Sequence, residues 1–292
     1  MSGPRMMINL FLDRISVTSV ARTPEPNQVM NDPDQADAFE AAGSDAGILG
    51  FLYLYHAIQA TTVIRPGDTV LDLACGPANQ LLQTAILNPD ADFVGVDASP
   101  RMIDKANALL MRHGLRNVKV ALGNMTGLTE FADGSVDCIT CTMSLHHLAD
   151  QSELVSTFSE IGRILRPNGG LYVADFGRLN RLATMRYFSE DWKGEQSPAF
   201  TLDFLRSLQA AFHVSELASA AAIGGCTVEY FATALAPFLV VFKTSGRREW
   251  SDQTERRVRA QYEALVPAQR QKFQALSRWL HAGRCALPSR LQ

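Results

Sequence analysis

The sequence predicts an α/β fold, in which helices cover both faces of a doubly wound and mostly parallel sheet. Five short apolar segments alternate with helical patterns between residues 69 and 176. Two further apolar segments, residues 226–234 and 237–243, follow closely enough to pair antiparallel. Because strands that alternate with helices form parallel sheets with right-handed crossovers, we expect a seven-stranded sheet whose last strand is antiparallel, with helical additions at both ends of the chain.

The individual elements follow from apolar periodicity and from residues that begin or end helices. Ser99 and Pro100 provide an N-cap and a first-turn proline, which predict a helix that continues to about Arg112. The sequence PNGG at residues 167–170 ends another helical pattern just before the fifth strand. The expected parallel strands are residues 69–74, 92–97, 117–122, 136–142 and 170–176, and the expected helices are residues 47–63, 79–87, 99–112, 152–165 and 200–213.

Composition and charge argue against several classes of protein. The 292-residue chain is 47% hydrophobic and has a formal net charge of −3, so it lacks the basic excess that is typical of nucleic-acid-binding proteins. No apolar run reaches the length of about 18 residues that a membrane span needs, so we expect no membrane association. The N-terminus does not resemble a secretory signal, and we therefore expect a cytoplasmic protein.

The five cysteines lack the spacing of a disulfide framework and predict reduced thiols. Cys138 and Cys141 form a C-x-x-C pattern, but they lie inside the expected strand 136–142. Residues three apart on a strand point to opposite faces of the sheet, so these two thiols should not share a metal ion. We therefore expect no metal site.

The turn after the first strand indicates a nucleoside cofactor. In VLDLACGPAN, residues 70–79, an apolar run on the first strand leads to Asp72, and a tight turn follows around Gly76. Asp97 ends the second strand 21 residues after Gly76, a spacing that suits a carboxylate bound to both hydroxyls of a ribose. NAD requires the sequence G-x-G-x-x-G, which is absent here. A cofactor without phosphate fits better, and Asp72 supplies a carboxylate for its positively charged groups.

At this point the sequence resembles the class I S-adenosylmethionine-dependent methyltransferases, specifically the type 11 or UbiE-like group that acts on small molecules. Five blocks occur in the order of that family over residues 65–180, and each departs little from the family pattern. They are VLDLACGPAN, FVGVDASPRMIDKA, ALGNM, FADGSVDCITCTMSLHHLAD and ILRPNGGLYVADF. Ala74 and Ala78 replace family glycines, and Asn124 stands where an aspartate is usual. The resemblance implies a Rossmann-like fold and S-adenosylmethionine as the cofactor.

The resemblance also implies roles for individual residues. Asp97 should bind the ribose, the Ser-Pro-x-Met turn should cover the adenine, and Asn124 should accept a hydrogen bond from the adenine amino group. The residues expected to bind the cofactor are Asp72, Ala74, Gly76, Asp97, Ala98, Met102, Asn124, Met125 and Cys141.

Three residues at the same sheet edge are candidates for catalysis. His146 and His147 follow the fourth strand, and Asp175 ends the fifth. One histidine is a candidate for the base that a phenol or protonated amine would need. Packing or helix capping is the other interpretation of the pair, since the histidines occur in family members with different substrates. Asp175 should orient the rim of the site.

The substrate pocket should come from outside the common core, since family members usually build lids there. We expect a helical lid at residues 1–64, a core at 65–245 with a substrate cap at 178–225, and a C-terminal helical extension at 246–292. The last segment is basic, with ten Arg and Lys against four Asp and Glu over residues 247–290, which predicts a solvated helix face or a homodimer contact. The substrate-binding candidates are Tyr53, Tyr55, Arg186 and Tyr187, with His56, Phe188 and Trp192 nearby.

These observations lead to a functional hypothesis. We expect a methyltransferase that acts on O, N or C of a small, aromatic or partly apolar metabolite. Two alternatives stay open: a protein of this fold that uses S-adenosylmethionine for other chemistry, and a cofactor-binding partner protein without catalysis.

Overall fold

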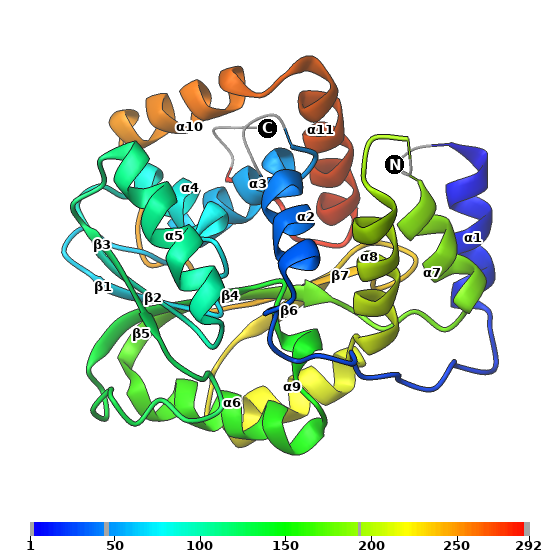
Figure 1. Ribbon diagram of the computed structural model, residues 1–292, viewed down its shortest axis with the longest axis horizontal. Helices are drawn as coiled ribbons and strands as arrows, with labels where there is room; N and C mark the ends of the chain where they lie inside the picture. The colour runs from blue at the N-terminus through cyan, green and yellow to red at the C-terminus, as the bar shows by residue number, and fades with distance from the viewer. Residues whose placement is uncertain (1–2, 44–46, 192–193, 289–292) are drawn as a thin grey trace.

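A seven-stranded sheet runs through the middle of the molecule (Figure 1). In the computed structural model, which describes residues 3–43, 47–191 and 194–288, the strand order is β3-β2-β1-β4-β5-β7-β6. Strand β7 is antiparallel to β5 and β6, and the other neighbouring strands are parallel, so the predicted fold class is confirmed. The strands are β1 (Thr69–Leu73), β2 (Asp92–Asp97), β3 (Val118–Leu122), β4 (Val136–Thr142), β5 (Leu165–Phe176), β6 (Glu229–Ala232) and β7 (Leu239–Lys243).

Two strands differ from the prediction at their boundaries. β5 begins at Leu165 rather than at Gly170, because Leu165 pairs with Val136 across a register shift that precedes the regular β4–β5 ladder. Asn168 within this stretch has a left-handed φ of +62°, so the chain still turns at the predicted place. β6 is shorter than expected, because only the residues from Glu229 to Ala232 pair with β7.

Helices cover both faces of the sheet (Figure 1). On one face lie α3 (Gly50–Thr61), α4 (Asn79–Leu87) and α5 (Pro100–His113), with α10 (Asp252–Ala264) and α11 (Pro267–Ala282) packed over α3 and α4. On the other face α6 (Gln151–Ile164) packs against α9 (Val214–Ile223). The hydroxyl of Ser99 accepts a hydrogen bond from the Met102 N–H at 3.3 Å, so the predicted N-cap of α5 is confirmed.

The two cysteines of β4 lie in different apolar layers. Cys138 packs in the layer that contains α3 and α4, whereas Cys141 packs in the layer that contains α6 and α9. Both thiols are fully buried, and burial raises the pKa of each. The prediction that they point to opposite faces is therefore confirmed.

Segments far apart in sequence meet beyond the sheet, on the side of the molecule where α1 (Pro4–Arg14), α7 (Leu182–Glu190) and α8 (Pro198–Ala210) lie (Figure 1). Here α7 packs against α1 and α8, while α8 also packs against α2 (Pro33–Gly43). The carboxylate of Asp13 on α1 accepts hydrogen bonds from the backbone N–H groups of Asn180 and Arg181, at the start of α7. Such a carboxylate stabilises a helix N-terminus, and here it also fixes α1 to α7.

Residues 17–32, which we call the strap, join α1 to α2 without regular secondary structure. The strap N–H groups of Val20 and Thr23 donate to the carbonyls of Asn180 and Gln209. The strap is therefore held against the segment that lies between β5 and β6.

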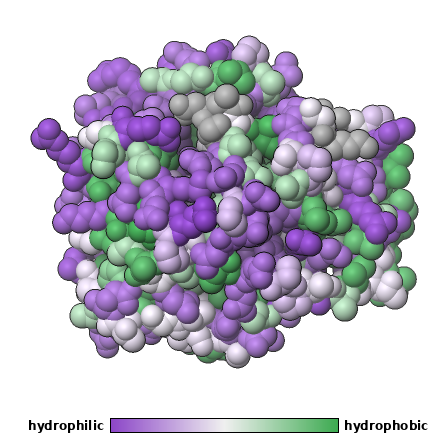
Figure 2. All heavy atoms as spheres, viewed as in Figure 1, coloured by the Kyte–Doolittle hydropathy of each residue, from purple (hydrophilic) through white to green (hydrophobic). Residues whose placement is uncertain are grey.

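Polar side chains cover most of the face seen in Figure 2, and apolar ones gather at the edge where α1 lies. Met7, Ile8 and Phe11 on α1 are each more than half exposed.

None of the described helices combines the length and the apolar character that a membrane crossing requires. The predicted homodimer stays a prediction.

Candidate active site

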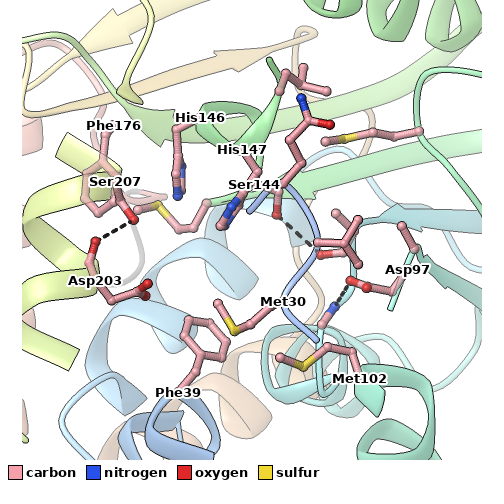
Figure 3. A pocket seen from close by; sticks show the side chains of 18 of the residues that line it. Met30, Phe39, Asp97, Met102, Ser144, His146, His147, Phe176, Asp203 and Ser207 are labelled. Carbon is pink, nitrogen blue, oxygen red and sulfur yellow. Dashed lines mark hydrogen bonds between the residues drawn. The ribbon is translucent and has the colours of Figure 1, made fainter. Parts of the chain in front are cut away.

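A cavity lies at the carboxyl ends of β1, β2 and β4, the edge at which sheets of this type bind ligands. It encloses about 1550 Å³ of space, part of which is its open mouth. Figure 3 shows Asp97 and Met102 toward one end and His146 and His147 toward the other, with Met30 between them.

The turn after β1 forms one wall of this cavity. Ala74 and Ala78 have φ angles of +51° and +65°, and Gly76 has a φ of +54°. The two alanines thus follow a left-handed path that glycine adopts more easily. A Cβ atom added to Gly76 would meet nothing closer than Cε1 of Phe39 at 4.0 Å, so the missing side chain leaves room for a ligand against the backbone.

Asp97 connects this turn to the turn after β2. Its Oδ2 atom accepts a hydrogen bond from the Gly76 N–H at 2.8 Å, and its Oδ1 atom accepts one from the Ser99 N–H at 2.8 Å. Burial raises the pKa of Asp97, although these two bonds oppose the shift. Asp97 lines the cavity, and each of its oxygens keeps a further lone pair. The carboxylate can therefore accept hydrogen bonds from two adjacent ligand hydroxyls.

The loops after β2 and β3 supply the remaining predicted cofactor residues that line the cavity, which are Ala98, Met102, Asn124 and Met125. Oδ1 of Asn124 accepts hydrogen bonds from both the N–H and the hydroxyl of Thr126 at 3.0 Å. These bonds fix the orientation of the Asn124 amide and occupy both lone pairs of its oxygen, so this geometry does not support the predicted hydrogen bond from the adenine amino group. Together with Asp97 and Gly76, the small and apolar side chains make a slot that fits a nucleoside.

Asp72 and Cys141 are the two predicted cofactor residues that do not line the cavity. Asp72 is buried beneath the turn, where it accepts a hydrogen bond from the Thr140 hydroxyl at 2.6 Å. Burial raises the pKa of Asp72 to about 7, with the Thr140 bond opposing and the charge of Asp97 adding to the shift. Cys141 faces the α6 layer instead of the cavity.

The three predicted catalytic residues lie together at the far end of the cavity. His146 and His147 belong to the short 3-10 helix η1 (Leu145–His147), and both line the cavity. Asp175 lies behind them, fully buried, with its Oδ1 atom 2.6 Å from Nδ1 of His146. Burial lowers the pKa of His146, but the charge of Asp175 and its hydrogen bond outweigh burial, and the net shift is upward. This contact leaves Nε2 of His146 free to face other groups.

Glu25 of the strap is a functional candidate that the sequence analysis missed. Its side chain is buried, with Oε2 3.0 Å from Nδ1 of His147 and Oε1 3.9 Å from Nε2 of His146. Ser207 on α8 donates a hydrogen bond to Oε1 of Glu25 at 2.7 Å. Burial acts to raise the pKa of Glu25, but the His147 contact, the His146 charge and the Ser207 bond lower it to about 2.

Arg22 places Glu25 at this position. Its guanidinium donates hydrogen bonds to the main-chain carbonyls of His146, Leu148, Ala149 and Ala210. The strap is thereby fixed to the loop after β4, three residues before Glu25.

The predicted substrate-binding residues are distributed differently. Tyr53 lines the cavity, whereas Tyr55 donates its hydroxyl to the Cys285 carbonyl at 3.1 Å on the side of α11. Residues two apart on a helix point in different directions, so both tyrosines cannot face one site. Arg186 is exposed on α7, and Tyr187 packs beside Phe188 outside the cavity. Trp192 lies outside the described residues.

Four phenylalanines, and not the predicted Arg186 and Tyr187, form an aromatic wall of the cavity. Phe176, Phe200, Phe204 and Phe238 line the cavity beside His146. The ring of Phe176 lies 5.3 Å from the rings of His146 and Phe204, measured between centroids. Asp203 on α8 adds a carboxylate to this wall (Figure 3). Burial and the charge of Glu25 raise the pKa of Asp203.

A doubly wound sheet with a cavity at its strand ends, and with a partly buried carboxylate at the end of the second strand, is the arrangement of proteins that bind a nucleoside cofactor. The sequence profile of a family described as "Methyltransferase domain" matches residues 64–214. The chain therefore belongs to the class I S-adenosylmethionine-dependent methyltransferases, in the UbiE-like group, and S-adenosylmethionine is the cofactor of this family.

Individual relatives agree with this assignment. A demethylmenaquinone methyltransferase from Symbiobacterium thermophilum is 34% identical over 117 residues, which are 39% of this chain and 45% of that protein. An arsenite methyltransferase from Halobacterium salinarum is 33% identical over 118 residues, which are 40% of this chain and 29% of that protein. These matches span less than half of either relative. A solved O-methyltransferase family protein from Burkholderia thailandensis, 19% identical over 73% of this chain and 60% of that one, has a TM-score of 0.52 and shares the fold.

Proposed function

We propose that this protein transfers the methyl group of S-adenosylmethionine to O, N or C of a small, aromatic or partly apolar metabolite. The observation that carries the proposal is the continuity of the cavity. One end has the carboxylate and bare backbone that a nucleoside needs, and the other has an aromatic wall next to two imidazoles.

The chain's own residues divide the work between binding and positioning. Asp97 would hold the ribose hydroxyls, Met102 and Met125 would contact the adenine, and Gly76 would let the cofactor approach the backbone. When bound, the cofactor supplies an already activated methyl group on a sulfonium. The protein must therefore mainly bring the acceptor close and in line and exclude water, which the apolar walls favour.

The polar end of the cavity would receive the reacting atom of the acceptor. A hydroxyl or a protonated amine loses a proton as it accepts a methyl group, so it needs a nearby proton acceptor. His146 and His147 line the cavity at the aromatic wall, and Asp175 holds the first of them in one orientation. The cluster therefore suits a phenol, an enol or an amine carried on a planar ring.

The test is to incubate the full chain with methyl-labelled S-adenosylmethionine and a panel of phenols, quinols and aromatic amines. We expect S-adenosylhomocysteine release together with labelled product for at least one acceptor class. Release without labelled product would favour other chemistry at the sulfonium. Tight binding of S-adenosylhomocysteine without turnover on a broad panel would favour a cofactor-binding partner protein and contradict the proposal.

A further inference from the structure

We infer that Glu25, His146 and His147 form a binding site for one divalent transition-metal ion at the acceptor end of the cavity. The three side chains come from two segments, the strap and η1, and their ligand atoms all lie within 4.8 Å of one another. A tetrahedral site with bonds of about 2.1 Å places its ligand atoms roughly 3.4 Å apart. Oε2 of Glu25 lies 3.0 Å from Nδ1 of His147, and Oε1 lies 3.9 Å from Nε2 of His146, so each carboxylate oxygen is within about half an ångström of that separation from one imidazole.

The surrounding contacts match those of a metal site. A metal-bound histidine usually donates its other ring nitrogen to a carboxylate, which fixes the ring and makes it a better ligand. His146 has this arrangement, since Nδ1 lies 2.6 Å from Asp175 while Nε2 faces Glu25. Ser207 in turn holds the Glu25 carboxylate through its hydroxyl at 2.7 Å. Two of the three proposed ligands are thus oriented by partners outside the site.

Charge and hydrogen bonding also favour a cation here. Three largely buried carboxylates, those of Glu25, Asp175 and Asp203, surround two imidazoles. Nδ1 of His147 is buried and makes no hydrogen bond to any described residue, although it lies 3.0 Å from Glu25. A metal ion between His147 and Glu25 would be coordinated by the Nδ1 lone pair of His147. The nearby Arg22 guanidinium is already engaged with main-chain carbonyls.

The donor set indicates which ions would bind. Two imidazoles and one carboxylate suit Zn²⁺ or Fe²⁺, whereas Mg²⁺ and Ca²⁺ prefer oxygen ligands. Three protein ligands leave at least one coordination position for another group. Because both imidazoles line the cavity, we assign that position to the nucleophilic oxygen or nitrogen of the acceptor. With the ion bound, both imidazoles are ligands, and the ion would favour loss of the acceptor proton by lowering its pKa, in place of an imidazole base. This role rests on the proposed function, but binding of the ion does not.

The experiment is metal titration of the full chain after treatment with a chelator. Zn²⁺ binding is followed by calorimetry, and Co²⁺ binding by its visible d–d absorption, which reports coordination by nitrogen and oxygen. We expect one ion per chain.

Asp175→Asn should weaken binding by about 10- to 100-fold, as loss of a partner that orients a metal ligand does. Loss of a ligand in E25Q or H147Q should weaken it by at least about as much. His113→Gln, which removes an exposed imidazole on α5, is the matched control and should bind as the wild type does.

The outcomes separate this inference from the proposed function. Absence of binding at about 100 μM Zn²⁺ and Co²⁺, or equal binding by the wild type, E25Q and H147Q, would overturn it and leave an ion-paired imidazole cluster. S-adenosylhomocysteine binding, measured in parallel, should be unchanged in E25Q, because the contacts of Glu25 are with His146, His147 and Ser207 at the acceptor end. If E25Q fails to fold by circular dichroism, H147Q provides the same test. Metal binding without methyl transfer to any acceptor would count against the proposed function alone.

Discussion

Replacement of Asp97 should weaken cofactor binding. The Asp97 carboxylate accepts one hydrogen bond from the Gly76 N–H and one from the Ser99 N–H. Two of its lone pairs remain for hydrogen bonds from the ribose hydroxyls. A hydrogen bond to a charged group contributes about 1.5–3 kcal/mol. Asp97→Asn keeps one acceptor oxygen and should raise the Kd of S-adenosylhomocysteine by about 10- to 100-fold. Asp97→Ala loses both bonds to ribose, and should raise it by more than about 100-fold.

Calorimetric titration with S-adenosylhomocysteine measures these changes directly, and thermal unfolding monitors the fold in parallel. Asp92→Asn is a suitable control, because Asp92 is exposed at the opposite end of the same strand, β2. Its Kd should equal that of the wild type. A Kd within about threefold of the wild type for Asp97→Ala would refute the placement of the ribose at this carboxylate.

Three further predictions test other parts of the structure. Asp72 has a pKa of about 7 in the folded protein, above its value in the unfolded chain. Between about pH 4 and 7 the folded protein therefore keeps a proton that the unfolded chain loses. The stability of the protein falls as the pH rises through that range. Asp72→Asn should therefore stabilise the protein by on the order of 2–4 kcal/mol in urea unfolding above pH 7 and by almost nothing near pH 4; a gain that does not depend on pH would contradict this. Ala78→Gly should raise the free energy of unfolding by about 0.5–1 kcal/mol, since it relieves a left-handed alanine, whereas Ala85→Gly within α4 should lower it. Phe204→Ala should raise the KM for the acceptor by roughly tenfold and leave the Kd of S-adenosylhomocysteine unchanged, and a change in the Kd instead would show that Phe204 contacts the cofactor.

The sheet and the cofactor end could be predicted because both depend on local patterns. Strands of alternating α/β units bring their carboxyl ends to one edge, so residues just after β1, β2 and β3 must meet there. Gly76, Asp97 and Asn124 all lie at such positions, and the structure places all three in one cavity wall. Asp72 precedes the end of its strand by one residue, and its side chain is buried beneath the turn.

The acceptor end could be predicted only in part. His146 follows β4, and Asp175 lies at the end of β5. The carboxyl ends of these two strands lie at the same edge of the sheet, which brings the two residues together. Glu25 lies in a segment without periodicity. Its position depends on the bond from Arg22 to Ala149, 127 residues along the chain, and on the bond from Ser207, 182 residues along the chain. Phe200 and Phe204 of the aromatic wall come from α8, whereas the prediction had chosen residues of α7. Nothing local distinguishes the amphipathic helix that faces the cavity from the one that packs beside it.

The strap contributes a carboxylate from outside the region that the family profile covers, which begins at residue 64. A comparison restricted to residues 64–214 includes His146 and His147 and leaves Glu25 out. Acceptor preference in this branch of the family should therefore follow the N-terminal segment. Exchanging residues 17–27 between members is then a direct route to altered substrate choice. The exchange leaves in place Met30 and Asn31, which accept hydrogen bonds from the Ser99 hydroxyl at the cofactor end.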